Sequence, residues 1–141
     1  MKHILVLCTG NSCRSQMAHG YLNDFLDSEK ITVYSAGIET HGINPGAAAI
    51  MKEDGLSIDH HTSNHVDEYA HIDFNYIITV CDHAKENCPF IPSKNALRLH
   101  HNFFDPSKAI GTDEEKHAAF LKARNEIKAY CKAFVEEYEL I

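Results

Sequence analysis

The feature that most constrains this chain is a short polar segment between an apolar run and a helical stretch near the N-terminus. Residues 3–7 form the apolar run, and residues 8–15 read Cys-Thr-Gly-Asn-Ser-Cys-Arg-Ser. Apolar side chains then recur at helical spacing from about residue 12 to residue 27. A strand, a Gly-bearing loop and a helix in this order can curl backbone N–H groups around a tetrahedral oxyanion, and the helix adds its positive end. The segment therefore predicts an oxyanion site at the carboxyl end of a buried strand.

Individual side chains of this loop suit the handling of such an anion. Cys8 would lie below the central atom, where the donors that hold the anion would also lower the pKa of the thiol. Arg14 can hold two oxygens bidentately, Ser15 could donate to the thiolate, and Asn11 could fix the loop through neighbouring backbone. Gly10 is expected to permit a backbone conformation that is costly for other residues. The plainer alternative is a packed strand-end thiol at Cys8 and a surface position for Arg14. The predicted oxyanion-binding residues are Thr9, Gly10, Asn11, Ser12, Cys13, Arg14 and Ser15.

Strands and helices alternate along the rest of the chain. Further strands are predicted over residues 31–36, 74–80 and 96–99, and further helices from Asn44-Pro45 to near Gly55 and from the capping box at residues 112–115 onward. Alternation of this kind is typical of a parallel sheet that is covered on both faces. We therefore expect an α/β fold with one domain over residues 1–141.

Composition excludes several functional classes. The chain has 141 residues and a formal net charge of −7, which disfavours a nucleic-acid surface. We therefore expect no nucleic-acid partner. No apolar run approaches the roughly 20 residues that span a bilayer, so no membrane partner is expected either. The five cysteines are an odd number without a signal peptide, which argues against a disulfide framework. We expect a cytoplasmic monomer.

A second pair of cysteines follows the strongest strand signal. Cys81 and Cys88 bracket a polar segment, and Cys8 also follows a strand. The carboxyl ends of parallel strands share one edge of the sheet, so Cys8 and Cys81 should meet there. Three thiols within reach of one another could pass a disulfide along the chain, from Cys8–Cys81 to Cys81–Cys88. The alternatives are a buried strand-end thiol with an incidental Cys88, and a zinc site that includes His83, although the spacing forms no tight CxxC pair.

These motifs resemble those of the low-molecular-weight protein tyrosine phosphatase superfamily, and within it the thioredoxin-coupled arsenate reductases. The resemblance runs over nearly the whole chain, through residues 8–18, 34–42, 44–45, 61–63 and 81–89. It implies a four-stranded parallel sheet with helices on both faces, Cys8 as nucleophile and Arg14 as the oxyanion clamp. It further implies Cys81 and Cys88 as a redox shuttle, with thioredoxin as reductant and phosphate or sulfate as mimics of arsenate. Residual phosphatase activity is expected, and arsenical resistance is the implied biological role.

The same resemblance assigns a general acid. Asp105-Pro106 matches the acid loop of the superfamily, since a proton donor is needed near the leaving oxygen. Taken alone, this dipeptide would be an ordinary turn. The tyrosine phosphatases usually carry aromatic residues after it, whereas Ser107 and Lys108 follow here, so a phosphotyrosine ring would lack that wall. The alternatives to a reductase are therefore a phosphatase, which needs only Cys8, Arg14 and Asp105, and a non-enzymatic oxyanion or arsenite sensor.

The chain departs from the family at a cation site. Some members bind potassium through Asn, Glu, Ser and Asp near the loop; Asn11 and Ser35 match, but His19 and Asn64 stand at the carboxylate positions. Losing two carboxylates disfavours a hard cation, so no tightly bound cofactor or metal is expected.

The other two cysteines are interpreted as packing residues. Cys13 lies inside the loop, at a family position with no required role, and Cys131 lies on the apolar face of the last helix.

Overall fold

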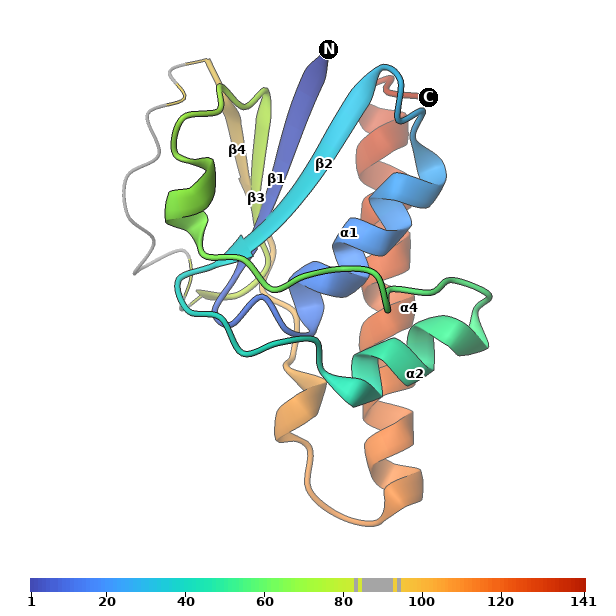
Figure 1. Ribbon diagram of the computed structural model, residues 1–141. Coiled ribbons are helices and arrows are strands. Elements are labelled where there is room, and N and C mark those ends of the chain that lie inside the picture. Colours follow the sequence, from blue (N-terminus) through green and yellow to red (C-terminus); the bar gives the residue numbers. More distant parts are fainter. Residues whose placement is uncertain (83, 85–92, 94) are drawn as a thin grey trace.

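Four parallel strands form the centre of the molecule (Figure 1). The structure is a computed structural model that describes residues 1–82, 84, 93 and 95–141. Strand β1 (Lys2–Cys8) pairs with β2 (Ile31–Gly37) on one side and with β3 (Tyr76–Thr79) on the other, and β4 (Leu97–His100) continues the sheet beyond β3. The order β2-β1-β3-β4 places β1 and β3 at the centre, so the residues that follow them meet at one edge.

Among the residues that the structure describes, three α-helices pack on one face of this sheet (Figure 1). They are α1 (Arg14–Phe25), α2 (Pro45–Glu53) and α4 (Asp113–Glu137). Ile4 and Val6 of β1 point into this larger core, where they meet buried side chains of all three helices. Leu5 and Leu7 point to the opposite face, where the 3-10 helix η1 (Val66–Tyr69) and Phe74 cover them. The predicted class, an α/β fold with a four-stranded parallel sheet, is confirmed.

Local sequence signals explain where the helices begin. The Asn44 side chain accepts hydrogen bonds from the N–H groups of Gly46 and Ala47, and Pro45 occupies the first helical position. Thr112 caps α4 by accepting from the N–H of Glu115, whose carboxylate accepts in return from the Thr112 N–H. Helix α1 begins at Arg14, two residues later than predicted, because the segment before it forms the loop. Within the described part of the chain, no helix is long and apolar enough to span a membrane.

Candidate active site

Asn11 fixes the conformation of the loop between β1 and α1. Its backbone is left-handed, with φ of +46°. Its side-chain oxygen accepts from the Asn64 N–H at 2.8 Å, and its Nδ2 donates to the Ser15 hydroxyl at 2.9 Å. Its backbone carbonyl accepts from Gln16 Nε2 at 3.0 Å. Asn11 is fully buried, so these bonds fix both its side chain and its main chain. The expected role in shaping the loop is consistent with this geometry.

Gly10 serves a different purpose from the one predicted. The left-handed residue of the loop is Asn11, and Gly10 does not have a positive φ. A Cβ at Gly10 would collide with the imidazole of His41, which packs against this point of the loop. The expectation of a special backbone conformation was therefore wrong, because the constraint on Gly10 is the space that His41 occupies.

Cys8 is buried at the end of β1, and its pKa is held well below the ordinary value for a thiol. The largest cause is a hydrogen bond from the neighbouring Cys81 thiol, and it outweighs the opposing effect of burial. The positive charge of Arg14 and the N–H and hydroxyl of Ser15 lower the pKa further. Since the Ser15 oxygen already accepts from Asn11, its own proton is free to point at Cys8. These groups favour the thiolate form of Cys8, which is the nucleophilic form of a cysteine.

The Arg14 side chain reaches from the loop across the site to Phe103 and Asp105. Its Nη1 donates to the Phe103 carbonyl at 3.0 Å, and its Nη2 lies 3.6 Å from Asp105 Oδ2. Among the described residues, its buried Nε–H has no acceptor. An oxyanion held in the loop would provide the acceptor that this buried donor needs, because unpaired buried donors are costly. The side chain is thus positioned for an anion and tied to the opposite wall of the site.

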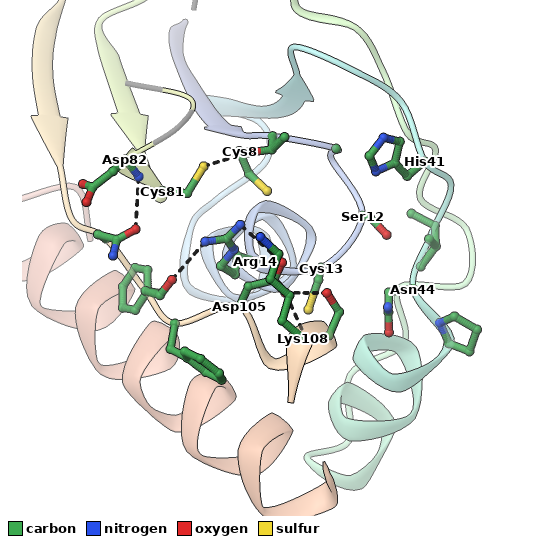
Figure 2. A pocket seen from close by; sticks show the side chains of 18 residues that line it. Cys8, Ser12, Cys13, Arg14, His41, Asn44, Cys81, Asp82, Asp105 and Lys108 are labelled. Carbon is green, nitrogen blue, oxygen red and sulfur yellow. Dashed lines mark hydrogen bonds and ion pairs between the residues drawn. The ribbon is translucent and has the colours of Figure 1, made fainter. Parts of the chain in front are cut away.

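Cys81 approaches the loop from the end of β3, as the shared sheet edge predicts (Figure 2). Its Sγ lies 3.2 Å from Thr9 Oγ1 and accepts from the Ala84 N–H at 3.3 Å. Its pKa is raised, mainly because its proton is shared with the Cys8 thiolate, and burial adds to the effect. The same contact therefore favours the protonated form of Cys81 and the thiolate form of Cys8. The other predicted relay thiol, Cys88, and His83 of the zinc alternative lie outside the described residues.

These groups open into one cavity of about 900 Å³ (Figure 2). Asp105 lies on its wall, where its Oδ1 accepts from the Ser107 N–H at 3.0 Å and from the Ser107 hydroxyl at 2.6 Å. Phe104 also lines the cavity and is 62% exposed. The sequence predicted no aromatic wall because Ser107 and Lys108 follow Asp105-Pro106. An aromatic side chain nevertheless reaches the cavity from the other side of Asp105, at Phe104. The cavity is larger than a tetrahedral oxyanion requires.

The remaining cysteines lack the environment of a nucleophile. Burial and the nearby negative charges of Asp105 and Cys8 raise the pKa of Cys13. Burial raises the pKa of Cys131 to about 12 in the core under α4. In the described part of the chain all cysteines are free, namely Cys8, Cys13, Cys81 and Cys131.

Histidines occupy the region behind the loop where some family members bind potassium. His19 Nδ1 lies 2.8 Å from the Ser35 hydroxyl, and the His19 and His61 rings are 4.5 Å apart. His61 Nδ1 donates to Gln16 Oε1 at 2.9 Å. Imidazoles and an amide do not form the oxygen set that a potassium ion prefers, so these donors do not fit that ion. Its absence stays a prediction.

Burial, followed by the charges of neighbouring histidines, lowers the pKa of His19 to about 3 and that of His61 to about 4. Below an unfolded pKa of about 6.5, the unfolded chain therefore takes up protons that the folded chain refuses. This stabilisation is complete above that pH and is lost as the pH falls toward 4. We expect urea denaturation to give about 2 kcal/mol less stability at pH 5 than at pH 7 from this pair, after allowance for partial solvent screening. A His19→Gln/His61→Gln variant with the same pH dependence as the wild type would contradict this assignment.

Two of the positioning residues, Gln16 and Asn64, were not recognised as such from the sequence. Gln16 is fully buried, and its Nε2 also donates to the Thr62 carbonyl at 3.0 Å, so it ties the loop to the segment after α2. Asn64 contributes through its backbone N–H, which any residue except proline could supply. A buried amide one residue after Ser15 could have been suspected, because polar side chains in the first turn of such a helix face the loop. The carbonyls to which this amide donates, those of Asn11 and Thr62, could not have been identified from the sequence.

Known proteins provide an independent comparison. The sequence profile of the family described as low molecular weight phosphotyrosine protein phosphatase matches residues 3–139. The chain is 50% identical over 135 residues to an arsenate reductase of Halalkalibacterium halodurans, and 46% identical over 135 residues to an arsenate reductase of Bacillus subtilis. Each alignment covers 96% of both chains. A solved arsenate reductase in the phosphate-binding state is 27% identical, with a TM-score of 0.77 and coverage of 97% of this chain and 98% of that one.

Proposed function

The chain belongs to the low molecular weight phosphotyrosine protein phosphatase family, and from this premise we propose that it reduces arsenate to arsenite through Cys8, Cys81 and Cys88, with thioredoxin as the reductant. The observation that carries the proposal is the placement of a second thiol, Cys81, against the nucleophilic thiolate of Cys8. A hydrolase of this fold needs one cysteine. The names of the relatives that match over 96% of the chain support the same substrate.

In the first step, the Cys8 thiolate attacks arsenate held by the loop and Arg14. A sulfur–arsenic bond forms and an arsenic–oxygen bond breaks, with Asp105 delivering a proton so that the oxygen leaves as water. Backbone N–H groups of the loop and the α1 N-terminus stabilise the charge that develops on the remaining oxygens. Phosphate and sulfate would occupy the same place as unreactive mimics.

In the second step, Cys81 attacks Cys8 Sγ. The disulfide forms as the sulfur–arsenic bond breaks, and that electron pair reduces As(V) to As(III), which leaves as arsenite. Bonding of Cys8 to arsenic removes the thiolate that is the largest cause of the raised Cys81 pKa. The Thr9 hydroxyl and the Ala84 N–H remain to stabilise the Cys81 thiolate, so the first step activates the nucleophile of the second.

In the last steps, the Cys88 thiolate attacks Cys81 Sγ and releases Cys8 as a thiolate. The Cys81–Cys88 disulfide then takes two electrons from the dithiol of thioredoxin, which becomes a disulfide in turn. The relay requires a compartment in which thiols are kept reduced, and we propose the cytoplasm.

The deciding experiment measures arsenate-dependent NADPH oxidation with thioredoxin and its reductase, for the wild type and Cys88→Ser. The wild type should turn over continuously, whereas Cys88→Ser should release about one arsenite per chain and then stop, because its Cys8–Cys81 disulfide cannot be passed on. Sustained wild-type turnover by Cys88→Ser would refute the relay. Absence of arsenate-dependent oxidation in the wild type would refute the substrate.

A second candidate function is the hydrolysis of phosphate monoesters. The size of the cavity and the exposed ring of Phe104 on its wall favour it, since an aryl group could lie there. This activity would need Cys8, Arg14 and Asp105 alone. Aryl phosphate hydrolysis that survives in Cys88→Ser at the wild-type rate, together with no arsenate reduction by the wild type, would favour the phosphatase.

A further inference from the structure

Backbone pairing at the end of β3 stops one residue before Cys81. The Val80 N–H still donates to the Leu7 carbonyl at 2.9 Å, and the Val80 carbonyl still accepts from Phe103 at 3.1 Å. At Asp82 the acceptor is a side chain instead of a backbone carbonyl, since the Asp82 N–H donates to Asn102 Oδ1 at 3.0 Å. The main chain on the C-terminal side of Cys81 is therefore held by a side chain rather than by the sheet.

The Asp82 carboxylate is held as well, by a line of side chains that runs across β3 and β4. His100 Nε2 lies 2.7 Å from Asp82 Oδ1, and His100 Nδ1 lies 2.7 Å from the Thr79 hydroxyl. An ionised carboxylate can only accept, so Nε2 carries a proton. Thr79 fixes the orientation of the ring from the other side. Thr79, His100 and Asn102, together with Asp82 itself, thus form a clamp that holds the chain directly after Cys81.

This clamp lies beside the reactive thiol. Asp82 and Asn102 both line the active-site cavity together with Cys81; Figure 2 labels Asp82 and Cys81 on its wall. The His100 side chain is 21% exposed and that of Asp82 is 63% exposed. A carboxylate–imidazole contact this open to water contributes little to the stability of a fold. Its effect is instead expected in the geometry of Cys81, whose Sγ must stay close enough to donate to Cys8.

We propose that the clamp of Thr79, His100, Asp82 and Asn102 positions the Cys81 thiol against Cys8 and thereby sets the rate of the exchange between them. His100 and Asn102 are positioning residues in this role, since they act through Asp82. The rate effect rests on the proposed function, whereas the placement of Cys81 against Cys8 does not.

The test compares His100→Leu, which removes the donor to Asp82, with His100→Gln, whose amide N–H can take the place of Nε2–H. The first measurement is the Cys8 pKa, from the pH dependence of its alkylation in the reduced chain without arsenate. We expect His100→Leu to raise this pKa by about half a unit or more, because Cys81 no longer donates steadily to Cys8. His100→Gln should recover most of the wild-type value. His117→Ala is a matched control, because His117 forms a similar pair with Glu53, 3.0 Å away, on α4 and α2.

The second measurement is the rate of Cys8–Cys81 disulfide formation after arsenate is mixed with the reduced chain. We expect a fall of about tenfold in His100→Leu, partial recovery in His100→Gln and no change in His117→Ala. An unchanged Cys8 pKa in a folded His100→Leu chain would overturn the clamp, as would a Gln variant as impaired as the Leu variant. If wild-type Cys8 and Cys81 form no disulfide with arsenate, the proposed function fails, and the Cys8 pKa still decides the clamp.

Discussion

Replacement of Cys81 by serine is expected to reduce arsenate turnover by about 1,000-fold or more while leaving the first chemical step intact. Serine has nearly the same shape as cysteine, and its hydroxyl can still donate to the Cys8 thiolate. The Cys8 pKa should therefore stay below its ordinary value. The variant should consume its Cys8 thiolate when arsenate is added, yet release no arsenite. Intact-mass measurement of the adduct, together with thioredoxin-coupled NADPH oxidation, checks both parts.

One further variant separates the two roles of the Cys81 thiol, and a second variant at Cys131 is its control. Cys81→Ala removes the donor, which is the largest cause of the low Cys8 pKa, so the pKa of Cys8 should rise relative to Cys81→Ser. Cys131→Ala removes a buried thiol from the core under α4 and should keep full turnover at a small cost in stability. NADPH oxidation by Cys81→Ser at the wild-type rate would be incompatible with a relay through this residue.

The arrangement of the strands follows directly from sequence patterns. The apolar run before Cys8 and the strong strand signal before Cys81 led to a parallel sheet with both cysteines at one edge, and the two thiols do lie together. Capping residues at Asn44 and Thr112 fixed the starts of two helices, because these side chains satisfy free N–H groups in only one position. Strand ends were less accurate, since Phe74 is buried by the second core without joining the β3 ladder.

The supporting contacts of the site could not be predicted in the same way. Gln16, His61 and His100 each have a partner between 18 and 46 residues away in the sequence, and spacing alone says nothing about such pairs. The reason for Gly10 was also hidden, because it depends on where the His41 ring packs. Residue types that carry the chemistry are visible in a motif. The residues that orient them are visible only once the chain is folded.

The second large effect is expected from Arg14→Lys, which keeps the positive charge but removes the planar fork. Lysine cannot donate to the Phe103 carbonyl, approach Asp105 and present a further N–H to an anion at the same time. We expect kcat/KM for arsenate to fall about 100- to 1,000-fold, as for the loss of one oxyanion donor elsewhere. Stabilisation of the fold by added phosphate, measured as a shift in Tm, should largely disappear.

Charge and geometry can be distinguished with the same residue. The Arg14 charge lowers the Cys8 pKa, so Arg14→Lys should leave that pKa low, whereas the neutral Arg14→Met should raise it. Arg124→Lys is the matched control, because Arg124 Nη1 also donates to a backbone carbonyl, that of Ile50, at 3.0 Å but on the side of α2 and α4. Its kcat/KM should stay within about twofold of the wild type. If Arg14→Lys kept both its phosphate-induced Tm shift and its kcat/KM, the anion would have to be held by the loop N–H groups alone, and the unpaired Nε–H of Arg14 would have no role in binding it.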